Sequence, residues 1–381
     1  MGLTSGALLT VVALVALACV AGTVWVWPRL ARRHWAALLG RLGTIVATQL
    51  ATLAALALVA NNYFSFYADW ADLLGTGGHQ PVAVQNHFAV GGGPAGAANG
   101  RTGVEQLGRY RAGGPLGDVP QRSGLIERVR ISGARSGLAG DGYVYLPPQY
   151  FSPRYAHRRL PVVVVLTGYP GDARNLLTRL DYPGVELDRL RAGRMRPTVL
   201  VLLRPTVAPP RDTECQDVPH GPQAETYFVR DVPKAVAAAY RVATGPHSWG
   251  VMGDSTGGYC ALRFAMRHPE AYGAAASLSG YYRAAVDTTT GDLFGGSARL
   301  RRESDLMWRL KHLPAPGVSV LVTTSRQGES DYRATQEFLA AVRPPLRASS
   351  ITLGSGGHNF HTWSTEIPVA LPWLADHLRE G

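Results

Sequence analysis

Lysine is almost absent from this chain of 381 residues, in which Lys234 and Lys311 are the two examples. Arginine therefore carries the formal net charge of +11. The chain has no run of five or more basic residues and no stretch in which basic and aromatic residues interleave, so the patterns of a nucleic-acid-binding surface are missing. The excess charge fits either an anionic cell envelope as partner or a compositional bias toward arginine, alanine and glycine.

Cysteine is also scarce, with Cys19, Cys215 and Cys260 in the whole chain. The three form no C-x-x-C pair and have no metal-ligand spacing, so we expect neither a structural zinc site nor another metal centre. The sequence leaves open whether Cys215 and Cys260 pair with each other. His79 and His87 lie in a glycine-rich stretch with no further ligand nearby, and we interpret them as solvated linker residues.

The N-terminal part of the chain lacks charge over two long runs, residues 7–27 and 42–60. Each run is long and apolar enough to cross a bilayer, so we predict a transmembrane hairpin over residues 1–74. The loop between the runs carries Arg29, Arg32, Arg33 and Arg41, while no charge precedes the first run. The positive-inside rule places this loop in the cytoplasm and both ends of the hairpin outside. A cleaved signal peptide fits less well, because it would need a positive segment before the apolar run.

Residues 75–123 contain mainly glycine, alanine and proline with little periodicity. This composition predicts a flexible linker between the hairpin and an outer domain over residues 124–381. We expect the linker to separate two independently folded parts of the chain.

Strand and helix patterns alternate in the outer domain. The segments "LIERVRISG" and "GYVYLPPQY" predict an antiparallel pair, and "LPVVVVLTG" predicts a strand buried on both faces. Further apolar runs alternate with segments of helical periodicity up to Leu378. The pattern predicts an α/β domain with a mostly parallel sheet and helices on both of its faces.

A glycine-flanked serine lies between one predicted strand and one predicted helix. "WGVMG" is the strand, Ser255 follows it, and "TGGYCALRFAMRH" is the helix. Gly253 and Gly257 complete the pattern G-x-S-x-G, the nucleophile elbow of the α/β-hydrolase fold. The alternative is an ordinary turn residue, but the strand–helix context favours a nucleophilic Ser255.

A nucleophilic serine needs a base and an acid that orients the base, and in this fold they follow in the order serine, acid, histidine. His358 lies on the glycine-rich loop "LGSGGHNFHTW" and is the candidate base, with His361 as its rival. Asp331 and Glu329 follow an earlier strand and are the candidate acids. Asp331 is also a plausible N-cap of the next helix.

The oxyanion formed during acyl transfer needs two N–H donors. One is the amide that follows the nucleophile, on Thr256, and the other belongs to the loop after an early strand. That loop reads "TGYPGD", where Pro170 has no N–H, so the predicted second donor is Tyr169.

These motifs resemble the putative-esterase family of α/β-hydrolases, which includes esterase D, the enterochelin esterases and the secreted mycolyltransferases. The resemblance rests on "YVYLPPQY", "LPVVVVLTGYPGD", "GDSTGGYCALRFAMRHPEAYGAAASLSGYY" and "GGHNFHTW". It implies ester hydrolysis or acyl transfer through an acyl-serine without a cofactor, with Ser255 as nucleophile, His358 as base and Asp331 favoured over Glu329 as acid.

The chain departs from the mycolyltransferases at two places. Thr167 replaces their aspartate before the oxyanion-loop glycine, and Cys215 has no partner within its own segment for their nearby disulfide. Both departures argue against a trehalose-mycolate substrate. The segment Tyr281–Gly296 forms either a wall of the cleft or only a surface loop.

The sequence thus predicts a membrane-anchored, extracytoplasmic serine esterase or acyltransferase of the cell envelope that acts on acyl esters, with a lipid or glycolipid as one candidate substrate. The alternative is a non-catalytic module that binds the cell envelope on a retained α/β-hydrolase fold. A binding module has no need of a base and an acid beside the serine.

Overall fold

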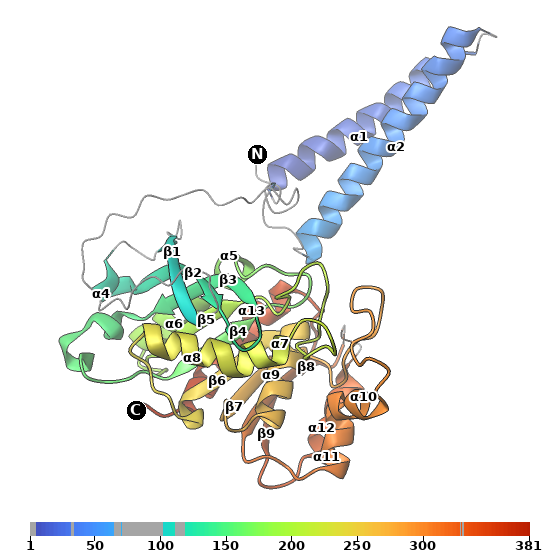
Figure 1. The fold of residues 1–381 in the computed structure, drawn as a ribbon. Helices are drawn as coiled ribbons and strands as arrows, with labels where there is room; N and C mark the ends of the chain where they lie inside the picture. The colour runs from blue at the N-terminus through green and yellow to red at the C-terminus, as the bar shows by residue number, and fades with distance from the viewer. Residues whose placement is uncertain are drawn as a thin grey trace. The chain divides into compact units, whose positions relative to one another are not determined.

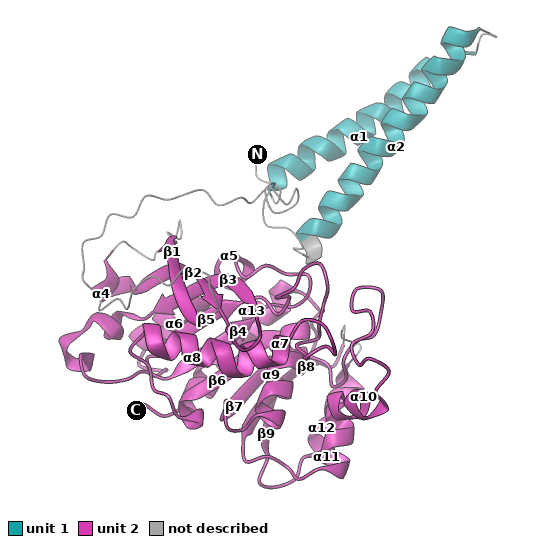
Figure 2. Ribbon diagram, viewed as in Figure 1, with its two compact units in different colours: residues 1–80 teal, residues 81–381 magenta. Residues whose placement is uncertain are grey.

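The structure, a computed structural model, describes residues 5–31, 34–64, 70, 102–110, 119–327, 329 and 331–381. The chain divides into two compact units, residues 1–80 and 81–381, shown in teal and magenta in Figure 2. His79 and His87 lie outside the described residues. Each unit is described by itself below.

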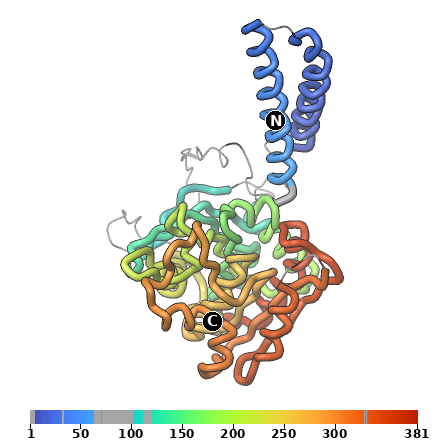
Figure 3. The backbone as a smooth tube through the Cα atoms, turned by 90° about the vertical axis from the view of Figure 1, so that its right-hand side faces the viewer, coloured from blue at the N-terminus to red at the C-terminus, as the bar shows by residue number. Residues whose placement is uncertain are grey.

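The first unit is a pair of helices, α1 (Gly6–Val26) and α2 (Trp35–Phe64), which lie side by side in Figures 1 and 3. The hydroxyls of Thr23 and Thr48 join them at 2.9 Å. Both helices are long and apolar enough to cross a bilayer. Helix α1 matches the first predicted span within one residue at each end, and α2 extends beyond both ends of the second.

The second unit is built on a nine-stranded sheet in the described part of the chain, in the order β1-β2-β3-β5-β4-β6-β7-β8-β9. Its strands are β1 (Gly103–Arg109), β2 (Leu125–Ser132), β3 (Ala139–Leu146), β4 (Val162–Leu166), β5 (Val199–Leu203), β6 (Trp249–Asp254), β7 (Ala274–Leu278), β8 (Ser319–Ser325) and β9 (Arg347–Leu353). Strands β4 to β9 pair in parallel, while β1, β2 and β3 are antiparallel. The predicted mostly parallel sheet and its antiparallel β2–β3 pair are confirmed.

Helices connect the strands. They are α4 (Pro120–Ser123), α5 (Asn175–Thr178), α6 (Tyr182–Arg191), α7 (Ala224–Thr226), α8 (Val232–Ala239), α9 (Thr256–Arg267), α10 (Ala298–Ser304), α11 (Leu306–His312), α12 (Tyr332–Ala341) and α13 (Phe360–Asp376). Short 3₁₀ helices are η1 (Pro148–Phe151), η2 (Pro153–Tyr155) and η4 (Pro246–Ser248), and η3 (Tyr227–Asp231) is a π-helix. Figure 1 labels the helices in place.

The two faces of the sheet carry separate apolar cores. Successive side chains of a strand point to opposite faces, so Val162 and Val164 of β4 join one core while Val163 and Val165 join the other. Helices α8, α9 and α12 supply buried residues to the first core, and α6 and α13 supply them to the second. Strand β4 is therefore buried on both faces, as its continuous run of valines predicts.

Strand β1 lies within the segment 75–123 that the composition assigns to the linker. It pairs antiparallel with β2, from Gly103 opposite Ser132 to Arg109 opposite Glu127. Val104 packs against the first core, while Glu105 and Gln106 stay exposed. The composition predicted a linker here, but the structure shows a strand. A short edge strand needs only backbone pairing and one packed valine, so its sequence lacks the alternation of apolar and polar residues that marks a longer strand.

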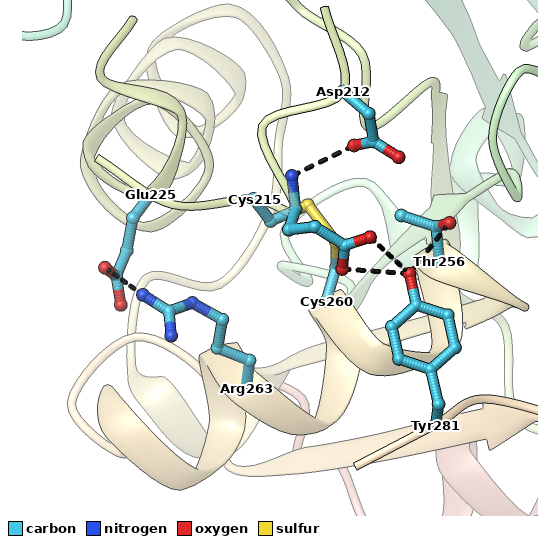
Figure 4. The surroundings of a disulfide bond; sticks show 8 residues. Asp212, Cys215, Glu225, Thr256, Cys260, Arg263 and Tyr281 are labelled. Atoms are coloured by element: carbon cyan, nitrogen blue, oxygen red, sulfur yellow. Dashed lines mark hydrogen bonds and ion pairs between the residues drawn. A yellow bond between two sulfur atoms is a disulfide. The ribbon is translucent and has the colours of Figure 1, made fainter. Parts of the chain in front are cut away.

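A disulfide joins Cys215 to Cys260 of α9, across 45 residues of sequence. A second contact joins the same helix to α7: the buried guanidinium of Arg263 donates a hydrogen bond to Glu225 at 2.7 Å. Nearby Arg263 and Arg267 lower the pKa of Glu225 against the effect of its burial. The loop before α7 is therefore fixed to the helix that follows Ser255 (Figure 4).

Loss of the disulfide should destabilise the second unit. In the chain-entropy model, a cross-link over a loop of this length contributes about 4 kcal/mol, so Cys260→Ala should markedly lower the apparent melting temperature of the detergent-solubilised chain. Cys19→Ala is the matched control, because Cys19 is a free cysteine of α1. Equal melting temperatures for Cys260→Ala and the control would contradict this role of the disulfide.

Candidate active site

Ser255 occupies the bend between β6 and α9. Its backbone angles are φ 53° and ψ −119°, a strained conformation for a residue with a side chain. The strand ends at Asp254 and the helix starts at Thr256, so the bend is confined to one residue. This is the local geometry expected of a nucleophile elbow.

The two glycines of the elbow are required by close backbone contacts. A Cβ atom at Gly257 would lie 2.4 Å from the carbonyl oxygen of Leu166, and one at Gly253 would lie 2.5 Å from the same oxygen. Real Cβ atoms do not approach this closely. The first turn of α9 therefore packs directly on the end of β4, which holds Ser255 at the carboxyl edge of the sheet.

His358 lies beside the serine, on the loop between β9 and α13. Its Nε2 atom is 2.8 Å from the Oγ atom of Ser255, close enough for a hydrogen bond. Its ring packs against the ring of Trp363 in a T-shaped arrangement, with ring centroids 5.2 Å apart. The rival candidate, His361, is an exposed residue in the first turn of α13.

The two candidate acids have different surroundings. Glu329 accepts a hydrogen bond from the backbone N–H of Ser325 at 2.9 Å. Desolvation by the surrounding side chains lowers the pKa of His358, and the charge of Asp331 raises it less strongly. Burial and the charge of Glu329 raise the pKa of Asp331 to about 6. Asp331 is therefore ionised at neutral pH and acts electrostatically on His358.

No hydrogen bond joins Asp331 to His358 within the part of the chain that the structure describes; the flanking Gly328 and Ser330 lie outside it. Catalytic hydrogen bonds are often long before substrate binds. Asp331 takes the N-cap position of α12, but its side chain makes no capping hydrogen bond. Its carboxylate is thus not engaged in holding that helix.

The loop after β4 approaches the nucleophile closely. A Cβ atom at Gly168 would lie 3.0 Å from the Cβ atom of Ser255, and the N–H of Gly168 donates to the Asp254 carboxylate at 2.8 Å. The next N–H, on Tyr169, and that of Thr256 make no hydrogen bond within the described residues. These are the two amides expected to face an oxyanion.

Sequence reasoning missed the role of Asp254, which stands at the variable position of G-x-S-x-G. Its side chain is buried, and burial raises its pKa to about 7. By accepting the Gly168 N–H it fastens the loop after β4 to the elbow. A carboxyl residue next to a predicted nucleophile was the available signal.

A second buried acid beneath the site was also missed. Glu366 of α13 accepts a hydrogen bond from the hydroxyl of Thr323 at 2.8 Å, and that hydroxyl accepts one from the N–H of Ser279 at 3.0 Å. Burial raises the pKa of Glu366 to about 8. The network joins the ends of β7 and β8 to α13. Its members are far apart in sequence, so no local pattern predicts it.

The described residues hold no group of three or more side chains suited to a metal ion. The geometry brings together a serine hydroxyl, a histidine nitrogen, a nearby carboxylate and two free amides. This arrangement suits attack on a carbonyl carbon with stabilisation of the oxyanion that forms.

Comparisons with known proteins agree with this geometry. The sequence profile of a family described as "putative esterase" matches residues 140–374. An uncharacterized protein of Corynebacterium glutamicum is 25% identical over 268 residues, which are 66% of this chain and 62% of the relative. The matched region thus spans about three-fifths of that relative's length.

Solved structures share the fold at low identity. An S-formylglutathione hydrolase of Agrobacterium tumefaciens has a TM-score of 0.57 at 16% identity, covering 72% of this chain and 99% of its own. A ferulic acid esterase has a TM-score of 0.56 at 17% identity, covering 67% and 99%. A fluorophosphonate-binding serine hydrolase of Staphylococcus aureus has a TM-score of 0.53 at 15% identity, covering 66% and 98%. These similarities confirm the predicted α/β-hydrolase fold.

The two acids can be separated by paired amide substitutions. Asp331→Asn should lower kcat for a p-nitrophenyl ester by up to about 10⁴, because the amide loses the charge that stabilises the imidazolium. Glu329→Gln should have a much smaller effect, since the bond from Ser325 can be kept by the amide oxygen. The two variants serve as controls for each other, with melting temperatures measured alongside. A steep loss in Glu329→Gln with near-normal Asp331→Asn would reverse the assignment.

Proposed function

The chain belongs to the putative-esterase family, and on that premise we propose that it is a serine esterase or acyltransferase that works through an acyl-serine intermediate. The observation that carries the proposal is the 2.8 Å contact between Ser255 Oγ and His358 Nε2 at a strained strand–helix bend. A serine that only shaped a turn would need no histidine at hydrogen-bond distance.

In the proposed reaction, Ser255 Oγ attacks the carbonyl carbon of an ester while its proton passes to His358 Nε2. The negative charge on the carbonyl oxygen is stabilised by the N–H groups of Tyr169 and Thr256. The oxyanion then collapses, the alkoxide leaves with the proton from His358, and the acyl group remains on Ser255. Water or another hydroxyl then attacks the acyl-serine by the same steps in reverse.

The protonation states of the site suit these steps. The pKa of His358 lies below its ordinary value of 6.5, so the ring is neutral and able to accept a proton at pH 7. Asp331, with a pKa of about 6, is then mainly ionised and stabilises the imidazolium that forms. No metal or organic cofactor takes part in the proposed reaction.

We place the catalytic unit on the outer face of a membrane. Helices α1 and α2 are candidate membrane spans, and arginine residues gather in the connection between them. The Cys215–Cys260 disulfide supports this placement, because disulfides persist mainly outside the reducing cytosol. An acyl ester of the cell envelope, such as a lipid or glycolipid, is the substrate class that fits an enzyme anchored there.

Ser255→Ala should abolish p-nitrophenyl ester turnover and labelling by a fluorophosphonate probe, while the melting temperature stays near that of the wild type. Loss of a triad member costs about three to six orders of magnitude in kcat. Ser248→Ala is the matched control, because Ser248 is a buried serine immediately before the other end of β6. Retention of a substantial share of activity by Ser255→Ala would overturn the assignment of Ser255 as nucleophile. Absence of both turnover and labelling in the wild type would leave the fold with a non-catalytic, binding role.

The proposed topology can be tested with alkaline phosphatase fusions in a bacterial host. A fusion after Gly75 should be active, because it follows both predicted spans and emerges outside. A fusion after Leu38 should be inactive, because it follows only the first span and stays in the cytoplasm. The opposite pattern would overturn both the orientation and the envelope substrate.

A further inference from the structure

A second carboxyl group lies beside the helix that follows the nucleophile, and the proposed mechanism does not use it. Glu214 is 1% exposed and sits in a left-handed backbone conformation with φ 48°. Its N–H donates to the Asp212 carboxylate at 2.9 Å, and the next residue, Cys215, forms the disulfide to α9 (Figure 4). A strained, buried carboxyl held by a covalent link is positioned with little freedom.

Tyr281 connects this carboxyl to the elbow. Its hydroxyl oxygen lies 2.7 and 2.9 Å from the two carboxyl oxygens of Glu214 and 3.0 Å from the hydroxyl of Thr256. A phenol carries a single proton, so when it donates to Glu214 the Thr256 hydroxyl donates to it. The Tyr281 ring is stacked on Tyr259 of α9, with ring centroids 5.1 Å apart. The three side chains form a continuous chain of hydrogen bonds.

Thr256 is the last residue of this chain of hydrogen bonds. It is the first residue of α9, directly follows Ser255, and carries one of the two amides in the proposed oxyanion hole. Thr256 is 5% exposed, and Figure 4 shows the hydrogen bond between its hydroxyl and that of Tyr281. A hydrogen bond that fixes this side chain also restricts the first turn of the helix, and with it the direction of the N–H.

We propose that Glu214 and Tyr281 are positioning residues that hold the Thr256 amide toward the oxyanion. The proposal rests on the proposed function, since it assigns a role in the same acyl transfer. Oxyanion stabilisation depends on donors that are in place before the charge develops. A small misplacement of such a donor can lower the rate by about 10²-fold. Neither residue contacts the reacting atoms in this role; both act through Thr256.

The charge state of Glu214 is consistent with this role. Burial and the neighbouring Asp212 raise its pKa to about 8, against the hydrogen bond from Tyr281, and Asp287 raises it further. Tyr259 of α9 also faces it, and the charge of Glu214 raises the pKa of that phenol. Glu214 is therefore mainly neutral at pH 7 and ionises as the pH rises through about 8. An ionised Glu214 would place negative charge near the developing oxyanion and slow the reaction.

The test compares two phenol deletions in the full-length, detergent-solubilised chain. Tyr281→Phe should lower kcat for a p-nitrophenyl ester roughly ten- to a hundredfold with KM little changed. Tyr272→Phe is the matched control: Tyr272 is also buried, stacks on Phe264 of α9, and donates to the carbonyl of Phe228 at 2.7 Å, so it loses an equivalent hydrogen bond. Equal kcat values for the two variants would overturn the proposal.

A second pair of variants tests the same chain of hydrogen bonds at Thr256. Thr256→Val keeps the backbone N–H but lacks the hydroxyl, so its kcat should fall as in Tyr281→Phe. Thr256→Ser restores a hydroxyl, so its kcat should be well above that of Thr256→Val. The double variant Tyr281→Phe/Thr256→Val should lose no more than either alone, because both break one chain. Fully additive losses would overturn the proposal, and full activity of Thr256→Val would overturn it even if Tyr281→Phe failed to fold.

The pH profile separates positioning from a purely structural role. In the wild type, kcat should decline as Glu214 ionises above about pH 8, and Glu214→Gln should remove that decline. The same decline in Glu214→Gln would overturn the electrostatic part of the proposal. Fluorophosphonate labelling of Ser255 in the wild type tests the proposed function itself, so a failure there is distinguishable from a failure of the positioning role.

Discussion

The contact between the end of β4 and the first turn of α9 determines the rest of the site. The carbonyl oxygen of Leu166 lies so close to Gly253 and Gly257 that neither position has room for a side chain. The same contact forces the bend at Ser255, because β6 must end and α9 must begin within one residue. The chain after Leu166 continues into the loop of Gly168, so the oxyanion loop reaches the nucleophile as a consequence of the same packing. One close approach of β4 to the β6–α9 bend thus positions both the serine and its proposed donors.

A second set of constraints acts on α9 from its other side. The disulfide to Cys215 and the buried ion pair of Glu225 with Arg263 fix the preceding loop to the helix at two points. A buried ion pair is only weak evidence for stability, because desolvation offsets much of its attraction. Its geometric effect is clearer: together with the disulfide it holds Glu214 where Tyr281 can reach it. The helix is therefore anchored by the sheet on one side and by a covalently closed loop on the other.

The sequence predicted the parts of this arrangement that depend on local spacing. The elbow was predictable because G-x-S-x-G lies between an apolar run and a helical pattern, and the fold followed from the alternation of such segments. Chain order predicted His358 as the base, and the structure brings its Nε2 atom to 2.8 Å from Ser255 Oγ, while its catalytic role stays a prediction. Asp331 and Glu329 stayed unresolved because they are two residues apart on one loop. The Cys215–Cys260 and Glu214–Tyr281 pairs were not predictable, because they join distant segments through residues with positive φ that are not glycine. Strand β1 was missed because a short, glycine-flanked edge strand has hardly any alternation.

The carboxyl groups around Ser255 differ in charge according to what each can contact. Asp331 has a pKa of about 6 and is mainly ionised at neutral pH, where it stabilises positive charge on His358 in the proposed mechanism. Burial raises the pKa of Asp254 to about 7 and that of Glu214 to about 8. Asp254 is hydrogen-bonded to the loop that carries one proposed oxyanion donor, and Glu214 is linked through Tyr281 to the residue that carries the other. Full ionisation there would oppose the developing negative charge, whereas a neutral carboxyl can still hold an amide or a phenol in place. Burial thus leaves Glu214 mainly neutral and Asp254 only partly ionised at pH 7, whereas Asp331, whose pKa is raised less far, stays mainly ionised.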